Sequence, residues 1–214
     1  MKRQRPPHAV HLPGLLHRLV EWVRGHDQLL VRGSAQMPLL LLSYPREGLS
    51  AARQIELAYN RTWTGLSAQL RGPYEELWPA LPAMVIVLLR ARNACGCLGH
   101  HHPPGTESRL ARRLAAELGH PIAEIDLAYQ AIRDWQPEPL AWLGVGVAAA
   151  EMRPIHFQAG ALAVLMHEME HLAFPGRSER EVRARSRQFY TDAMRELVAA
   201  ELGGDYGVAW SRPL

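Results

Sequence analysis

The sequence predicts an α+β domain that is mainly α-helical, with a few short strands and an HExxH-bearing helix packed on a long C-terminal helix. Two observations predict this fold class. Apolar residues recur at helical spacing through several segments, and proline or glycine ends most of these segments. Only two continuous apolar runs, over residues 37–42 and 83–89, have the length of buried strands.

In the N-terminal half, apolar residues at helical spacing after a Pro-Gly pair predict a helix over residues 15–23. The apolar run that ends at a proline predicts a buried strand over residues 37–44. A serine that can act as N-cap begins a predicted helix over residues 50–70, which has one apolar side. Residues 84–89 fit either a strand or a buried helix.

In the C-terminal half, helical spacing predicts helices over residues 107–118 and 122–135, separated by a Gly-His-Pro break. Residues 143–150 are apolar and rich in glycine, and they fit either a helix or a strand. A predicted helix over residues 156–174 ends at a Pro-Gly pair. A serine N-cap then begins the last helix, over residues 178–202.

The chain divides into three parts that we expect to form one integrated domain. Residues 1–92 form a mainly helical N-terminal part, and residues 106–214 form a helical metal-binding part that contains the HExxH motif. Between them, residues 93–105 are rich in cysteine, histidine, glycine and proline, which predicts a loop.

With 214 residues, 48% of them apolar and 21% charged, the chain has the composition of a soluble globular protein. The net charge of +3 is too small to indicate a nucleic-acid partner by itself. Cys95 and Cys97 are badly placed to bridge each other, so we expect a reducing, cytoplasmic location. Because no segment resembles a signal peptide or a membrane span, we expect no membrane partner.

Residues 167–171 read His-Glu-Met-Glu-His, an HExxH motif. On a helix, residues four apart differ by about 40° in direction, so His167 and His171 point the same way and can hold one tetrahedral metal ion. Glu168 lies about 100° around the helix from His167, where it reaches a metal-bound water. The composition predicts only about 0.04 such motifs by chance. The motif therefore predicts a Zn²⁺ centre with Glu168 as general base.

Through His167, Glu168 and His171 the chain resembles the zincin metallopeptidases, over the motif helix and the helix after it. The resemblance implies zinc-dependent hydrolysis of a protein or peptide substrate. Glu170 departs from the family pattern, which has an uncharged residue at this position. The glycine and histidine that follow the motif in the metzincin clan are replaced here by Phe174 and Arg177, which excludes that clan.

The third metal ligand is expected among the acidic residues that begin the last helix. The segment Glu179-Arg180-Glu181-Val182-Arg183 resembles the E-x-E-A-N segment that follows HExxH in the repressor-cleaving peptidases of the ImmA/IrrE type. That resemblance implies Glu181 as the ligand, with Glu179 as the alternative, and a specific protein substrate such as a regulator. Val182 and Arg183 replace the alanine and asparagine of the family. Acidic residues in a first helical turn also favour the helix dipole without any metal.

A second resemblance is to peptide deformylase, which also has a helical HExxH, with an acidic residue at the position of Glu170. Its third ligand is a cysteine in an E-G-C-L-S segment, which residues 96–98 match in part. This resemblance implies Cys97 as the ligand and a deformylase-like amide hydrolase. The glycine loop of that family is matched in part by residues 144–151, but here the loop follows the cysteine and in the family it precedes it.

Residues 95–102 hold two thiols and three imidazoles. They fit a second metal site, a contribution of Cys97 or a histidine to the main site, or a polar loop. Two Glu-x-x-His pairs, one inside the motif and one at Glu117 and His120, match those of di-iron helical bundles, but a Gly-His-Pro sequence breaks the second helix. The arginines of the last helix fit a solvated face better than a nucleic-acid surface.

The sequence therefore predicts a cytoplasmic zinc metallohydrolase, a peptidase in which His167, His171 and Glu181 bind the metal and Glu168 is the general base. Two alternatives stay open: a non-catalytic metal-binding or interaction protein, and a deformylase-like amide hydrolase. The oligomeric state is left undetermined.

Overall fold

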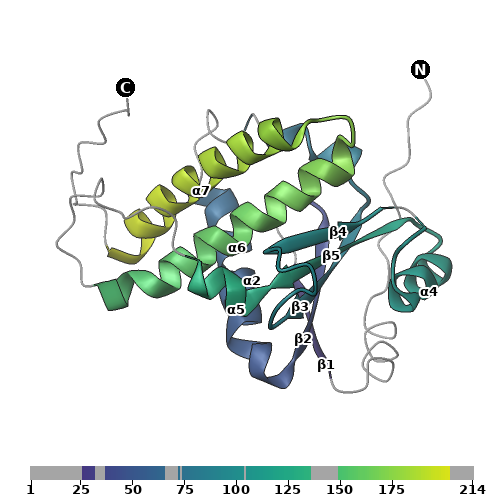
Figure 1. The fold of residues 1–214 in the computed structure, drawn as a ribbon, viewed down its shortest axis with the longest axis horizontal. Helices are drawn as coiled ribbons and strands as arrows, with labels where there is room; N and C mark the ends of the chain where they lie inside the picture. The colour runs from purple at the N-terminus through teal and green to yellow at the C-terminus, as the bar shows by residue number, and fades with distance from the viewer. Residues whose placement is uncertain are drawn as a thin grey trace.

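The structure is a computed structural model that describes residues 26–31, 37–65, 72, 74–103, 105–135 and 149–202. These residues form one mixed β-sheet with helices against both of its faces (Figure 1). Strands from before residue 93, from within residues 93–105 and from after residue 105 all join this sheet.

The sheet has five strands in the order β1-β2-β3-β5-β4. Their bounds are β1 His26–Val31, β2 Leu39–Pro45, β3 Met84–Arg90, β4 Gly99–His102 and β5 Ile122–Ala128. The three central strands, β2, β3 and β5, are parallel, and β1 and β4 are antiparallel to their neighbours at the two ends. The central strands are almost continuously apolar because both of their faces are covered by helices.

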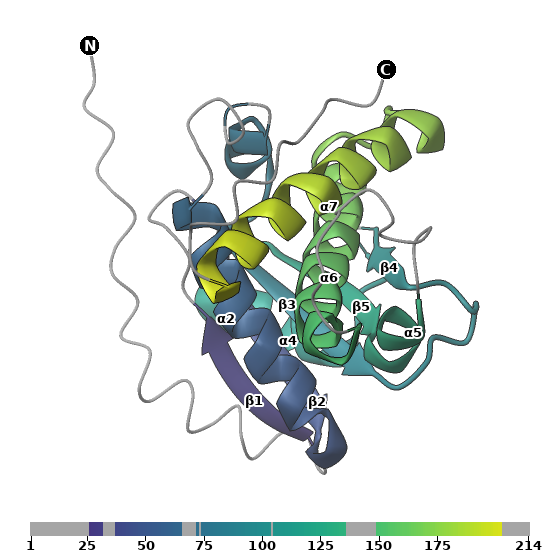
Figure 2. The ribbon, with the colours of Figure 1, turned by 90° about the vertical axis from the view of Figure 1, so that its left-hand side faces the viewer.

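The described residues also form five helices and two short 3-10 segments. Their bounds are α2 Leu49–Gly65, α4 Arg109–Leu118, α5 Tyr129–Asp134, α6 Ala149–Ala173, α7 Glu179–Leu202, η1 Arg46–Gly48 and η2 Trp78–Ala80. The helices α2, α5, α6 and α7 lie over one face of the sheet and enclose the larger core (Figure 2). The helix α4 packs on the opposite face over a smaller apolar cluster.

The expected fold class, a mainly helical domain with few short strands, is wrong, because the described residues form a mixed α/β fold around five strands. The largest difference is at residues 122–135, where a helix was predicted and the structure has β5 followed by α5. Every residue of β5 is buried, so its apolar residues satisfy a helical period and a strand period alike. The strand β4 lies inside the predicted loop at residues 93–105.

Several other predicted elements are confirmed. The strand expected at residues 37–44 is β2, and residues 84–89 form the strand β3. The helices expected at residues 50–70, 107–118, 156–174 and 178–202 correspond to α2, α4, α6 and α7. The helix predicted at residues 15–23, and most of residues 143–150, lie outside the described residues. No described helix combines the length and the apolar character needed to cross a membrane.

A buried group of ion pairs fixes α7 against α6. Glu170 on α6 is only 2% exposed, and its carboxylate accepts hydrogen bonds from Arg177 Nη1, at 3.1 Å, and from Arg185 Nε. Both arginines also pair with Glu76 Oε1, at 2.9 and 3.0 Å. A carboxylate buried this deeply requires such partners, so the group holds the turn after α6 and the start of α7 in place. Glu170, the residue of the motif that departs from the zincin pattern, therefore has a structural role in holding α7 against α6.

The strand β4 touches α6 at Gly99. A Cβ atom at this position would lie 2.6 Å from Val164 Cγ1 and 2.7 Å from Glu168 Oε1. Both separations are shorter than ordinary van der Waals contact, so glycine allows the strand to approach the helix this closely. The approach brings the end of the sheet to the HExxH residues.

We expect Gly99→Ala to lower the free energy of unfolding by about 1–3 kcal/mol, the range for over-packed contacts. Chemical denaturation followed by circular dichroism measures this free energy. Gly176→Ala is the matched control, because an added Cβ there meets nothing within 4 Å. Equal free energies of unfolding for the two variants would contradict the close contact between β4 and α6.

Candidate metal centre

The two histidines of the motif meet a carboxylate from α7. His167 Nε2 and His171 Nε2 face each other at 3.3 Å, one turn apart on α6. Glu179 Oε2 lies 3.0 Å from His171 Nε2, and Glu179 Oε1 lies 3.6 Å from His167 Nε2. These three side chains form one of two groups of potential metal ligands within the described residues.

The separations fit a tetrahedral ion held between the three groups. With metal–ligand bonds of about 2.1 Å, the ligand atoms of a tetrahedral site lie about 3.4 Å apart. The measured separations of 3.0, 3.3 and 3.6 Å are close to this value. Burial lowers the pKa of His167, against the opposing effects of Glu168 and Glu179. The imidazole is therefore neutral near pH 7, as a metal ligand must be.

The group is open to solvent on one side. The His167 and His171 side chains are 18% and 17% exposed, whereas that of Glu179 is 51% exposed. On the buried side, His167 Nδ1 lies 3.4 Å from Ser186 Oγ, a contact of the kind that orients a ligating imidazole. Three protein ligands with one open side are typical of a catalytic zinc site, whereas structural sites are closed by four.

The structure brings Glu179, and not Glu181, to the histidines. Glu181 Oε2 instead accepts hydrogen bonds from the backbone N–H of Ser178 at 2.9 Å and from its hydroxyl at 2.6 Å. Together with the Glu181 N–H donating to Ser178 Oγ, at 3.4 Å, these bonds form a capping box at the start of α7. The bonds from Ser178 lower the pKa of Glu181. The residue that the structure places beside the histidines is therefore Glu179, two positions before the Glu181 that the resemblance implied.

Glu179 is charged and held in place by a neighbour. Arg183 Nε donates to Glu179 Oε1 at 2.6 Å. Partial burial by itself raises the pKa of Glu179, but the hydrogen bond from Arg183, together with the nearby histidine rings, lowers it overall. The carboxylate is therefore ionised at neutral pH, which a metal ligand requires.

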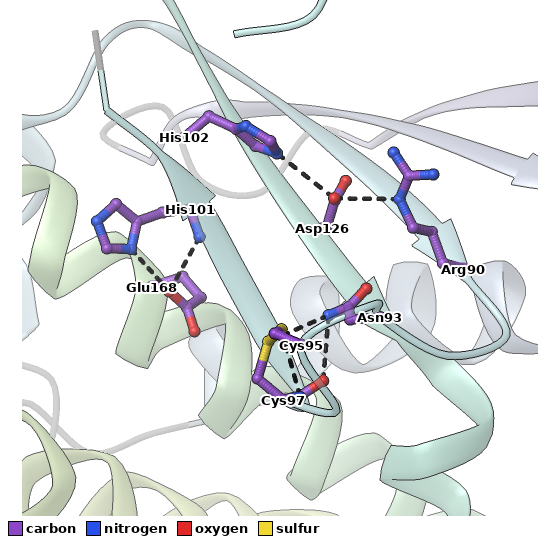
Figure 3. Close-up of a disulfide and its surroundings, with 8 residues drawn as sticks. All are labelled: Arg90, Asn93, Cys95, Cys97, His101, His102, Asp126 and Glu168. Carbon is purple, nitrogen blue, oxygen red and sulfur yellow. Dashed lines mark hydrogen bonds and ion pairs between the residues drawn. A yellow bond between two sulfur atoms is a disulfide. The ribbon is translucent and has the colours of Figure 1, made fainter. Parts of the chain in front are cut away.

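Glu168 lies beside the histidines and contacts β4. The backbone N–H of His101 donates to Glu168 Oε2 at 3.1 Å, and His101 Nδ1 lies 2.9 Å from the same oxygen (Figure 3). The His101 ring also stacks on that of His171, with centroids 5.2 Å apart. Glu168 is thus a buried carboxylate whose orientation is fixed by the end strand of the sheet.

The sequence did not single out His101 among the three histidines of its loop. A loop prediction leaves side-chain directions open. Within a strand, however, successive side chains point to opposite faces. With residues 99–102 assigned as a strand, His101 points to one face and His100 and His102 point to the other. Recognising this strand in the sequence would have indicated His101 as the histidine that contacts Glu168.

Cys95 and Cys97 are joined by a disulfide, so the expectation that they do not bridge each other is wrong. The argument for a reducing compartment loses its basis with this bond. The loop is further held by Asn93 Nδ2, which donates to Cys97 O at 3.2 Å (Figure 3). As a disulfide, Cys97 offers no thiolate to a metal, and it belongs to neither group of potential ligands.

The second Glu-x-x-His pair is not presented by one helix. Glu117 lies near the end of α4, which ends at Leu118. Gly119 has a φ of 66°, so it turns the chain out of the helix before His120. A di-iron bundle needs two such pairs on helices, and in the described part of the chain only the pair within the HExxH motif lies on one.

Comparisons with known proteins leave the site to be interpreted from its own geometry. No protein family matches the chain, and no curated protein and no solved structure matches it. The resemblances to the zincins and to peptide deformylase therefore rest on the short motifs quoted above.

We expect Glu179→Gln to weaken zinc binding by roughly ten-fold or more, because the amide lacks the charge of a ligand carboxylate. Glu181→Gln is the matched control two residues away, and we expect it to leave zinc affinity unchanged while it weakens the helix cap. Competition with a chromophoric chelator measures both affinities. A greater loss of affinity in Glu181→Gln would show that Glu181 is the ligand.

Proposed function

We propose that the protein is a zinc-dependent hydrolase of amide bonds, most simply a peptidase. The observation that carries this proposal is the grouping of His167, His171 and Glu179, open on one side, with the buried carboxylate of Glu168 next to it. Three ligands leave room for water and substrate. A Zn²⁺ ion bound there would lower the pKa of a water toward 7.

In the proposed reaction Glu168 accepts a proton from the attacking water and returns it to the leaving amine. Its contacts with His101 both involve Oε2, so Oε1 is the oxygen proposed to take the proton. Because Glu168 is fixed by the backbone of β4, it loses little conformational freedom when it acts, which favours proton transfer. The Glu179 side chain is 51% exposed, and we propose that the substrate enters the site from this side.

The position of β4 supports a peptide as the substrate. Among the described strands β4 ends the sheet, and it pairs with β5 alone. The N–H of His101 points to Glu168, so the unpaired edge of the strand runs along the candidate centre. Because the His101 N–H is already taken by Glu168, we propose that an extended peptide pairs with the remaining main-chain groups of this edge. A specific protein substrate and a cytoplasmic location stay predictions.

The contacts of Glu168 also support a second candidate, a non-catalytic protein in which the metal is structural. In that case the bonds between Glu168 and His101 would serve only to hold β4 against α6. A test must therefore remove the charge of Glu168 and keep its contacts. Glutamine does this, because its amide oxygen can accept from the His101 N–H.

We expect Glu168→Gln to keep its zinc and to lose activity by about 10²- to 10⁴-fold, the range attributed to general bases. Elemental analysis gives the zinc content, and mass spectrometry of digests of a peptide mixture and of a formylated peptide gives the activity. Glu181→Gln is the matched acid-to-amide control and should retain activity.

His167→Ala should lose hydrolysis together with the zinc of the candidate metal centre. Full activity of Glu168→Gln would exclude Glu168 as general base. Zinc-dependent folding with no cleavage of any substrate by the wild type would favour the structural role.

A further inference from the structure

The second group of potential ligands lies on the other face of the sheet. It consists of His102 on β4 with Glu124 and Asp126 on β5. Because successive side chains of a strand alternate, β4 directs His101 toward α6 and His102 to the opposite face (Figure 3). Glu124 and Asp126 are two apart on β5, so they share that face, which is the one α4 covers.

The register of the two strands sets the distances within this group. His102 and Glu124 are direct cross-strand partners, and Asp126 is two pairs further along, opposite His100. His102 Nε2 lies 3.6 Å from Glu124 Oε1 and 3.4 Å from Asp126 Oδ2. Both distances are long for a hydrogen bond. They match the edge of about 3.4 Å expected between the ligands of a tetrahedral ion.

The two carboxylates are buried, and an arginine contacts one of them. Glu124 is 1% exposed and Asp126 is 8% exposed, so two negative charges lie below the surface. Of the described residues, Arg90 supplies one cation, with its Nε 3.0 Å from Asp126 Oδ2. A buried pair of carboxylates is costly unless positive charge compensates both.

The hydrogen bonds of the group leave one carboxylate oxygen of Glu124 directed toward His102. Ser108 donates its backbone N–H and its hydroxyl to Glu124 Oε2, which leaves Oε1 as the atom nearest to His102. Asp126 approaches His102 with Oδ2, whereas its Oδ1 is buried and has no hydrogen-bond partner among the described residues. Fully buried polar atoms without a partner are rare in folded proteins, and a bound ion is one explanation for them.

We propose that His102, Glu124 and Asp126 form a second cation site that binds a divalent transition-metal ion. Imidazole with two carboxylates suits Zn²⁺ or Mn²⁺, whereas Mg²⁺ and Ca²⁺ prefer oxygen ligands alone. The ion compensates the second buried charge and bridges β4 to β5 below the candidate metal centre. This proposal does not depend on hydrolytic activity, and its ligands are distinct from His167, His171 and Glu179.

The test removes the first site in order to observe the second. We expect the full-length double variant His167→Ala/His171→Ala, stripped with a chelator, to bind one Zn²⁺ per chain in a titration against a chromophoric chelator. In this background Asp126→Asn should weaken zinc binding by roughly ten-fold or more. His102→Ala should do the same. His120→Ala is the control, because His120 is exposed and belongs to neither group of potential ligands, and it should leave the affinity unchanged.

For Arg90→Gln we expect the opposite effect, an increase in zinc affinity. The guanidinium repels a cation and occupies Asp126 Oδ2, so its removal should tighten zinc binding by about three-fold or more. A purely structural role of this ion pair predicts no such gain. Circular dichroism establishes which variants are folded, and Arg90→Gln tests the site even if a ligand variant unfolds, because the Arg90 side chain is half exposed.

Two results would overturn the proposal. One is a double variant that binds no zinc at all. The other is zinc binding that is unchanged in folded Asp126→Asn and in Arg90→Gln, which would place the ion elsewhere on the chain.

Discussion

The carboxylate of Glu170 is the constraint on which the arrangement of the candidate metal centre depends. It is buried in the α6–α7 interface, and such a charge is tolerated only with opposite charges in contact. Arg177 precedes α7 and Arg185 lies within it, so the two bonds fix where α7 begins and how it is rotated. That rotation brings Glu179 to the histidines of α6. A residue inside the HExxH motif thus controls which residue outside it completes the ligand group.

The strand β4 is the second constraint, and it acts on both faces of the sheet. Gly99 lets the strand reach α6, and the next residues direct one imidazole to Glu168 and another to the carboxylates of β5. A short strand can do this because its side chains alternate. The disulfide of Cys95 and Cys97 lies just before it and shapes the loop that leads into it. The four residues of β4 therefore contact both potential metal sites, one on each face of the sheet.

Burial and exposure are combined in the candidate centre in a way that suits hydrolysis. Burial keeps His167 neutral and so able to bind a metal, and it isolates Glu168 from bulk water. Glu179, by contrast, stays largely exposed and is kept ionised by Arg183 and the histidines. A site that is buried on one side and exposed to solvent on the other can hold its polar groups in fixed positions and still admit a ligand.

The sequence by itself determined local features: the HExxH helix with His167 and His171 on one side, the Ser178 cap of α7 and the strand β2. Local signals suffice for these because neighbouring residues decide them. The sheet was underestimated because the apolar residues of β5 and of the short helix α5 that follows it also fit one continuous helical period. The choice between Glu179 and Glu181 also required the tertiary structure. Residues two apart on a helix point about 200° apart, so only one of them faces α6, and packing through Glu170 decides which.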